Sequence, residues 1–483
     1  MAESSIPICS RPSQTKIVAT IGPACDNPEK LTELANAGVD VFRINMAHGN
    51  LDQHAKTLKA VRSVGEELGH PLAVLMDLAG PKIRLGELPD GEINCDASDT
   101  YRFVRGHEST GPKELTTTYE PLVDELAVGD RIMLADGTVS MIVEELGGDF
   151  AACKVIQPGL IRSRQGVNLP GAMISAPALG PADLENAEWG ATSGVDFVGL
   201  SFVRSEKEVR RLKELLRSNG SSAHVIAKIE KPEALEDISD IVEAADGIMV
   251  ARGDLGVEID IAEVAVAQKA IIAECNLQRK PVIIATQMLD SMQQSRLPTR
   301  AEVADVSNAV LDGADACMLS GETAIGKYPR EAVEMMHRIA LAAEPLCRDQ
   351  PTAMLPDLKD DGMNEITEAT VFAAGRMAEE LEAEMVIVAS ASGKTALALS
   401  KDRLYVPAIG VSDSPETLRR MNLYWGVIPL PAAPTADSRA LLEHITQWGR
   451  SGGLLDSGDR IVLIAGTGLA VTAHNMIVVH EIE

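Results

Sequence analysis

The sequence contains no apolar run long enough to cross a membrane. Its longest apolar stretches, such as 461–471 and 281–288, are interrupted by Gly, Thr or Gln and fall well short of the ~20 residues that a membrane span needs. The N-terminal residues show neither a basic start nor an apolar core, so no export signal is indicated. We therefore expect a cytoplasmic protein with no membrane partner.

Basic residues are scarce, because 44 Lys and Arg stand against 71 Asp and Glu, a formal net charge of −27. Nucleic-acid-binding surfaces need a basic face, so we expect no nucleic-acid partner. If the substrate is an anion, its pocket must be locally positive in a protein whose net charge is strongly negative. A cluster of Arg and Lys would therefore indicate where an anion binds. The seven cysteines show no paired spacing, a pattern typical of reduced thiols rather than of disulfides or a structural zinc site.

What the chain does contain is one repeated unit, an apolar run followed by an amphipathic segment of helical period. Eight such runs predict eight strands, at 16–22, 39–46, 72–78, 195–203, 224–230, 247–253, 281–287 and 314–322. Alternating strands and helices in this number favour a (β/α)8 barrel. An open doubly wound sheet is the alternative, although no Gly-x-Gly-x-x-Gly motif follows the first strand.

The third strand differs from the others because its helix is delayed. Residues 86–167 show short runs separated by Asp-Gly, Gly-Asp and Gly-Gly, which are hairpin signals. They predict a small inserted β-barrel domain that acts as a lid over the barrel mouth. The catalytic barrel is then formed by residues 1–85 and 168–345.

A third domain follows a predicted linker at 349–358. Residues 346–483 contain a helix near 365–381 and strands at 385–390, 406–412, 426–430, 460–465 and 476–479, which predicts a C-terminal α/β domain with a regulatory role. Its first turn includes Ser390, Ser392, Gly393, Lys394 and Thr395, and amides at such a turn suit a phosphate. The turn is not a P-loop, because Val388 stands where that motif needs Gly. A phosphorylated effector and an ordinary helix cap both remain possible there.

Charged and polar residues gather at the carboxyl ends of the barrel strands, where barrel enzymes place their chemistry. A buried strand should not carry such residues unless its end emerges into a site that pairs them. The candidates, in chain order, are Arg43, Asn45, His48, Asp77, Lys82, Arg84, Lys228, Glu230, Arg252, Asp254, Thr286, Gln287, Ser320 and Glu322.

Glu230 and Asp254 are hard oxygen ligands on adjacent strands, as Mg²⁺ or Mn²⁺ requires. The alternative is an acidic pair bound to Arg252 and Lys228. Basic side chains at the same mouth match phosphate or carboxylate, and amides at Gly253 and Asp254 could hold a carboxylate. The residues therefore predict a metal-dependent barrel enzyme acting on a small phosphorylated acid.

Eight stretches in the same order resemble the pyruvate kinase family. They are TKIVATIGP at 15–23, FRIN at 42–45, DLAGPKIR at 77–84, VNLPG at 167–171, AKIE at 227–230, GIMVARGDLG at 247–256, ATQML at 285–289 and MLSGET at 318–323. The resemblance implies the same three domains, usually in a homotetramer. It also implies the last step of glycolysis, phosphoryl transfer from phosphoenolpyruvate to ADP to give pyruvate and ATP.

The resemblance also implies roles for the candidate residues. Glu230 and Asp254 would bind the divalent ion, and Lys228 would neutralise the transferring phosphoryl group and the enolate. Thr286 would lie by the substrate carboxylate and help to relay a proton. Arg43 and Arg84 would contact phosphate oxygens. Asn45 and His48 would face the nucleotide, although His48 could equally be a surface histidine that caps a helix.

Two departures from the family pattern predict differences in ion use and regulation. Many members bind K⁺ through an Asn, a Ser, an Asp and a Thr with a Glu nearby, whereas this chain keeps Asn45 and Asp77 but has Ala47, Leu78 and Lys82 at the other positions. An ammonium group can supply the charge of that ion, so we expect K⁺ not to be required. The loop at 466–474 lacks Arg, Lys and Trp, which argues against fructose 1,6-bisphosphate as an activator.

Two other functions fit parts of the pattern. A metal-dependent lyase or aldolase acting on pyruvate-like acids also uses a barrel with Glu and Asp ligands, but it needs neither the lid nor so many phosphate-directed cations. A non-catalytic metabolite sensor on the same scaffold would have no reason to keep Lys228, Glu230, Asp254 and Thr286 together. Formation of ATP from phosphoenolpyruvate and ADP separates a kinase from the lyase or aldolase.

Overall fold

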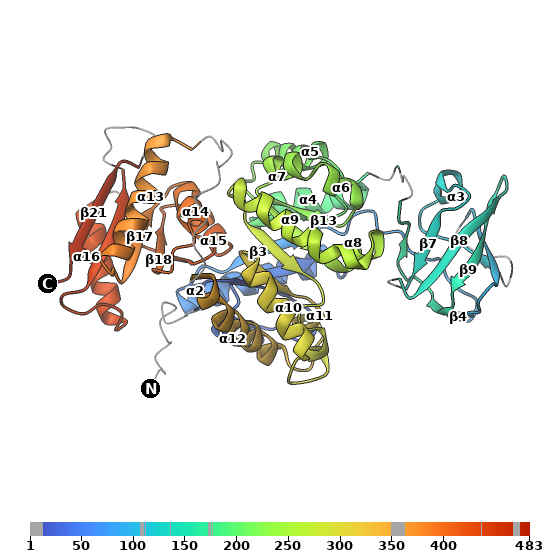
Figure 1. Cartoon of the computed structure of the whole chain (residues 1–483), viewed down its shortest axis with the longest axis horizontal. Helices are drawn as coiled ribbons and strands as arrows, with labels where there is room; N and C mark the ends of the chain where they lie inside the picture. Colours follow the sequence, from blue (N-terminus) through green and yellow to red (C-terminus); the bar gives the residue numbers. More distant parts are fainter. Residues whose placement is uncertain are drawn as a thin grey trace.

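The computed structural model describes residues 13–106, 111, 113–135, 137–171, 175, 177–348, 363–435, 437–466 and 474–483. The linker predicted at 349–358 and most of the loop at 466–474 lie outside these residues. Three lobes follow one another along the long axis of the molecule, with the barrel between the inserted domain and the C-terminal domain (Figure 1). None of the helices in the described ranges is long and apolar enough to cross a membrane.

The central lobe is a closed barrel of parallel strands, as predicted. Among the described residues it is formed by β1 (Lys16–Thr20), β2 (Val41–Asn45), β3 (Ala73–Asp77), β12 (Phe197–Leu200), β13 (His224–Ile229), β14 (Gly247–Ala251), β15 (Val282–Ala285) and β16 (Ala316–Leu319). Each end lies within three residues of its predicted position. The predicted runs were too long mainly at their carboxyl ends, where the chain leaves the sheet to form the mouth. The open-sheet alternative is wrong, because β1 pairs with both β2 and β16.

Helices surround this barrel and bury the outward side chains of its strands. The longer ones are α1 (Pro28–Ala37), α2 (Leu51–Leu68), α4 (Pro181–Ser193), α5 (Glu206–Ser218), α7 (Ile238–Ala244), α9 (Val264–Leu277), α10 (Arg300–Leu311) and α12 (Pro329–Arg348). Short helices occur at the mouth, namely α6 (Pro232–Glu236), α8 (Arg252–Glu258) and α11 (Gly321–Ala324). Local capping fixes several starts; for example, the Asn50 side chain accepts the Gln53 N–H at the start of α2.

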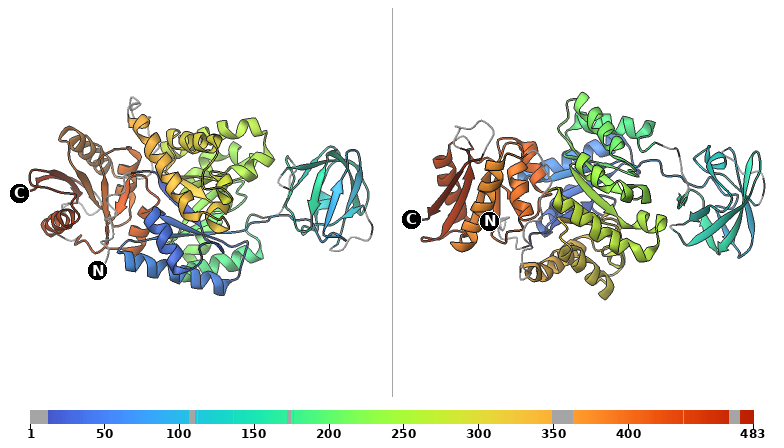
Figure 2. Two further views of the ribbon diagram at one scale, coloured as in Figure 1. Left: turned by 90° about the horizontal axis from the view of Figure 1, so that it is seen from below. Right: turned by 45° about the horizontal axis from the view of Figure 1, so that its top comes forward.

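The inserted domain follows β3 and has its own apolar core. Its described strands are β4 (Glu92–Cys95), β5 (Thr100–Val104), β6 (Glu114–Leu115), β7 (Arg131–Leu134), β8 (Val139–Leu146), β9 (Phe150–Gln157), β10 (Gly159–Arg162) and β11 (Val167–Asn168), with one short helix, α3 (Leu122–Glu125). They form a sheet in the order β11-β7-β8-β9-β5-β6 and a β10-β4 pair. Two extended connections join this domain to the barrel (Figure 2).

The C-terminal domain is an α/β sheet, also as predicted. Its described elements are α13 (Glu365–Glu380), β17 (Met385–Ala389), α14 (Lys394–Lys401), β18 (Ala408–Val411), α15 (Pro415–Met421), β19 (Val427–Pro429), α16 (Ser438–Ser451), β20 (Arg460–Ala465) and β21 (Met476–Glu481). The strand order is β19-β18-β17-β20-β21, with β21 antiparallel to β20. The boundaries proposed at residues 86, 168 and 346 stay predictions.

Four aspartates lie at the amino ends of alternate barrel strands, and two of them, Asp196 and Asp315, attach the C-terminal domain to the barrel floor. Each accepts a backbone N–H from a neighbouring strand: Asp40 from Ile17, Asp196 from Val74, Asp246 from Val225 and Asp315 from Val282. Two of them also bind cations of the C-terminal domain, because Arg419 lies 2.6 Å from Asp196 and Lys401 lies 2.6 Å from Asp315. Both aspartates and Lys401 are almost fully buried and the Arg419 side chain is 17% exposed, so these ion pairs require close docking of the two domains. The C-terminal domain thus occupies the barrel end opposite the lid.

His224, the first residue of β13, makes this floor sensitive to acid. Burial lowers the pKa of its imidazole from 6.5 to about 4. Below pH 6.5 His224 therefore binds a proton in the unfolded chain but stays neutral in the folded chain. Its contribution to the free energy of unfolding is fully present above pH 6.5 and is lost as the pH falls towards 4. We expect about 2 kcal/mol of unfolding free energy to be lost at pH 5. Urea unfolding at pH 7.5 and pH 5 measures this loss, and His224→Gln should reduce it; an equal loss in both proteins would contradict the assignment.

Candidate active site

The predicted site residues come together at the carboxyl ends of the barrel strands. Lys228 lies on β13 and Glu230 follows it, while Arg43 is on β2 and Asp77 ends β3. Asp254 is on α8, directly after β14. This convergence arises because parallel strands all end at the same rim of the barrel.

Lys228 is held inside this rim by two carboxylates. Its Nζ lies 3.0 Å from Glu230 Oε1 and 3.3 Å from Asp77 Oδ1, and it donates a 2.6 Å hydrogen bond to Ser201 Oγ. Burial alone would lower the pKa of the ammonium, but the charges of Asp77 and Glu230 outweigh it and raise the pKa above its ordinary value. Lys228 is therefore a fixed positive charge in a site of low dielectric.

Asp77 is paired on its other side with Arg43. Arg43 Nε and Nη2 lie 2.7 and 2.6 Å from Asp77 Oδ2, and Nη1 donates to Thr20 Oγ1. Burial would raise the pKa of Asp77, but Lys228 and Arg43 hold it below its usual range. The carboxylate therefore stays charged and fixes both cations in place.

Glu230 and Asp254 form an acidic pair that suits a divalent cation. Glu230 is 1% exposed, and its Oε2 accepts the Phe202 N–H at 2.7 Å. Burial raises the pKa of its carboxyl, and the charge of Asp254 adds to that rise despite Lys228. Lys228 and Lys82 offset part of this negative charge, and a bound divalent cation would stabilise the pair further. The described residues contain no group of three or more His, Cys, Asp or Glu placed for a metal.

Arg252 does not serve this acidic pair. Its guanidinium binds Asp305 at 2.6 and 2.7 Å and donates to the Thr286 carbonyl at 3.0 Å. Of the alternative in which Arg252 and Lys228 bind this acidic pair, the structure shows the Lys228–Glu230 contact at 3.0 Å, whereas Arg252 is paired with Asp305. Arg252 instead supports the turn that carries Thr286.

Thr286, in the loop after β15, and Gly253, in the first turn of α8, form a tight contact at the mouth. The Gly253 N–H donates to Thr286 Oγ1 at 2.7 Å, and that hydroxyl donates to the Ala285 carbonyl. A Cβ on Gly253 would lie 3.3 Å from Thr286 Oγ1, so glycine permits the approach. Thr286 and Gln287 both have left-handed φ values, 68° and 55°. Such strain costs about 1–3 kcal/mol per residue and persists where the surroundings enforce it.

The remaining predicted residues lie farther out. Lys82 Nζ is 3.4 Å from Asp254 Oδ1, with the side chain 33% exposed. Arg84 donates instead to the Arg164 carbonyl in the inserted domain, at 3.2 Å, so in this conformation it belongs to the lid side. Asn45 Oδ1 accepts the Ala47 N–H at 3.1 Å, and His48 is exposed.

Two site residues were missed by the sequence reasoning. Ser201 is buried, donates to the Leu78 carbonyl at 2.7 Å and accepts from Lys228. Phe202 has a φ of 56°, and this conformation directs its N–H to Glu230. Both follow β12, so the rule of polar residues at strand ends would have found Ser201. No local signal marks the backbone of Phe202.

The turn proposed for an effector is capped by its own side chains. Gly393, with φ 85°, donates its N–H to Ser390 Oγ at 3.1 Å, and the Lys394 N–H donates to Ser392 Oγ at 3.4 Å. Thr395 Oγ1 lies 3.2 Å from His474 Nδ1. A phosphate here would have to replace these serine hydroxyls as the acceptor of the amides.

Comparison with known proteins covers nearly the whole chain. A family model described as "Pyruvate kinase, barrel domain" matches residues 12–333, and one described as "Pyruvate kinase, alpha/beta domain" matches residues 368–480. The chain is 37% identical over 475 residues to the pyruvate kinase of Geobacillus stearothermophilus (97% of this chain, 80% of that protein). It is 40% identical over 454 residues to that of Agrobacterium vitis (94% and 93%). It is 41% identical over 467 residues to pyruvate kinase 2 of Synechocystis sp. (94% and 77%).

The closed barrel, its two flanking domains and these matches define a phosphotransferase. The chain belongs to the pyruvate kinase family. The family, the fold class and the enzyme class predicted from the sequence are thereby confirmed.

Proposed function

We propose that this protein transfers the phosphoryl group of phosphoenolpyruvate to ADP and releases pyruvate and ATP, as in the last step of glycolysis. The observation that carries the proposal is the ammonium of Lys228, which is held charged between Asp77 and Glu230; the charge of Asp254 in turn acts on Glu230. A fixed cation at this place stabilises the charge of a transferring phosphoryl group and of the enolate left behind.

The roles proposed for the other residues follow from their positions. Glu230 and Asp254 would hold the divalent ion, Mg²⁺ or Mn²⁺, and Mg²⁺ is what the family generally uses. Bound there, it would supply Lewis-acid stabilisation of the substrate oxygens. Gly253 and Asp254 would border the substrate carboxylate.

Arg43, already fixed by Asp77, would orient phosphate oxygens. Asn45 and His48 would face the nucleotide, and Arg84 would join them if the inserted domain closes as a lid. After transfer, the enolate carbon takes up a proton, which Thr286 would relay through water. The lid would exclude bulk water from the phosphoryl group.

We also propose that K⁺ is not required. The Lys82 ammonium lies beside Asp254 and would supply the charge that the ion provides in other members. The two candidate ligands that remain are already engaged, because Asn45 Oδ1 accepts the Ala47 N–H and Asp77 Oδ2 binds Arg43. A cation close to Lys82 would also be repelled by it.

Assembly and regulation are further parts of the proposal. We expect a homotetramer in the cytoplasm, on the family pattern. A phosphorylated effector at 390–395 is the less supported of these expectations, since the serine hydroxyls cap the turn. Titration of activity with a panel of sugar phosphates tests it.

A lactate dehydrogenase-coupled assay for pyruvate is the decisive experiment. We expect activity that depends on phosphoenolpyruvate, ADP and Mg²⁺, that disappears after chelation with EDTA and that returns when Mg²⁺ is restored, because Glu230 and Asp254 alone cannot bind phosphate oxygens. ATP measured in parallel must equal pyruvate. Pyruvate without ATP would favour the lyase or aldolase, and no product with retained binding of phosphoenolpyruvate would favour the sensor.

A further inference from the structure

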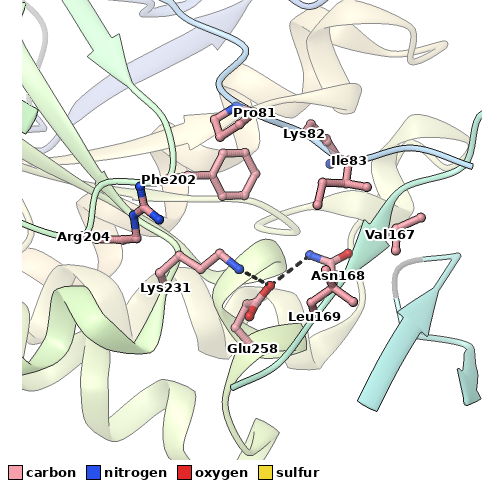
Figure 3. Close-up of a pocket in the computed structure, with 10 residues that line it drawn as sticks. All are labelled: Pro81, Lys82, Ile83, Val167, Asn168, Leu169, Phe202, Arg204, Lys231 and Glu258. Atoms are coloured by element: carbon pink, nitrogen blue, oxygen red, sulfur yellow. Dashed lines mark hydrogen bonds and ion pairs between the residues drawn. The ribbon is translucent and has the colours of Figure 1, made fainter. Parts of the chain in front are cut away.

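A pocket lies where the inserted domain joins the barrel. Both chain connections border it, at 81–83 and 167–169, together with loops that follow β12 and β13 and the end of α8. Figure 3 shows Lys231 and Asn168 pointing from opposite sides toward Glu258, which closes the floor of the pocket. The pocket therefore brings one buried carboxylate next to the hinge of the lid.

Glu258 joins the hinge to the barrel through one oxygen. Its Oε1 accepts from Lys231 Nζ at 2.7 Å and from Asn168 Nδ2 at 3.4 Å, and its side chain is 1% exposed. The other oxygen, Oε2, is buried without a hydrogen-bond partner among the described residues. Burying a charged carboxylate costs free energy, which its partners must offset. An apolar side chain would fill the same space without that cost, so filling space does not explain why a glutamate is at position 258.

The helix that carries Glu258 also carries part of the proposed metal site. α8 begins at Arg252 and ends at Glu258, and it is ~10 Å long at 1.5 Å per residue. Its first turn holds Gly253, which binds Thr286, and Asp254. At its other end, a Cβ on Gly137 of the lid would lie 3.8 Å from Val257. One short rigid element therefore touches both the substrate site and the lid.

We propose that Glu258 is a positioning residue that sets the lid and the metal site together. Its carboxylate ties Asn168 at the lid hinge and Lys231 after β13 to α8, so movement of the lid and placement of Asp254 are coupled. The inference rests on the proposed function, because it assigns the coupling to phosphoryl transfer. Glu258 is not among the residues proposed to hold the metal or the substrate.

The test is Glu258→Gln, which keeps the size of the side chain and removes its charge. We expect kcat to fall about tenfold, the loss that corresponds to weakening one charge-assisted hydrogen bond. The Mg²⁺ concentration for half-maximal activity should rise in parallel, whereas the KM for phosphoenolpyruvate changes less. Glu263→Gln is the matched control, because Glu263 is exposed five residues farther on, and it should change none of these quantities.

A second variant and a measurement that does not depend on turnover distinguish the proposed coupling from a general loss of activity. Asn168→Ala alone should lower kcat. Combined with Glu258→Gln it should lower kcat little further, because both substitutions act on the same contact between Asn168 and Glu258. Small-angle scattering should show that phosphoenolpyruvate with Mg²⁺ compacts the wild-type protein more than Glu258→Gln. Full additivity, or unchanged kcat and compaction in a folded Glu258→Gln protein, would overturn the coupling. Failure of the wild-type protein to make ATP would overturn the proposed function instead.

Discussion

Replacement of Lys228 by methionine is expected to lower kcat about 10³-fold. Methionine keeps an unbranched apolar stem and lacks only the terminal ammonium, so the change isolates that charge. In the transition state that charge would face the phosphoryl group and the developing enolate, and preorganised electrostatic groups of this kind contribute about 3–4 kcal/mol each. The coupled assay at saturating phosphoenolpyruvate, ADP and Mg²⁺ measures the loss.

Controls must separate this loss from damage to the site. Without Lys228, Glu230 and Asp77 lose a partner, so Mg²⁺ binding should become tighter or stay unchanged, which calorimetry can measure in the absence of turnover. Lys269→Met, at a lysine side chain that is 59% exposed on α9, should leave kcat unchanged. Turnover of Lys228→Met within tenfold of the wild type would contradict the proposed role of the ammonium.

Lys228 illustrates why much of the site could be predicted from the sequence. Charged residues inside short apolar runs are expensive unless a site pairs them, so Lys228 and Glu230 stand out without any structural information. Because the carboxyl ends of parallel barrel strands meet at one rim of the barrel, these two residues are then expected to lie near Arg43 and Asp254. The same apolar runs locate the barrel strands to within three residues.

Side-chain partners far apart in the chain could not be predicted in the same way. Asp305, the partner of Arg252, lies 53 residues later on α10, and nothing in its local sequence distinguishes it from other surface acids. Arg84 belongs to a motif at the barrel mouth, yet its guanidinium lies against Arg164 of the inserted domain. Its place depends on the lid orientation, which is a tertiary property.

One signal was present in the sequence and was missed. Three of the four aspartates on the barrel floor end a Gly-x-Asp sequence, at 38–40, 194–196 and 313–315. In the fourth, at 244–246, alanine replaces the glycine. The glycines at 38, 194 and 313 all have positive φ, which lets the preceding helix end and the strand begin at once. The repeat precedes three of the four alternate strands, and two of its aspartates, Asp196 and Asp315, bind cations of the C-terminal domain.

Exchange of Lys82 for glutamate is the second prediction with a large effect, because it reverses the sign of a charge next to Asp254. The Lys82 ammonium lies 3.4 Å from that carboxylate; a glutamate would instead add a third acid beside Glu230 and Asp254. We expect turnover without K⁺ to fall about 10²-fold. Added K⁺ should recover part of it, because a monovalent cation can replace the lost charge.

The measurement compares activity in sodium-free Tris or tetramethylammonium buffer with and without KCl, at saturating substrates and Mg²⁺. The wild-type protein should show little response to KCl. Lys82→Gln removes the cation without adding an acid, so it should lose less activity than Lys82→Glu and respond less to K⁺, which separates the missing charge from the attraction of a new carboxylate for the ion. Strong activation of the wild-type protein by KCl would mean that the Lys82 ammonium does not take the place of the monovalent ion, even though it lies beside Asp254.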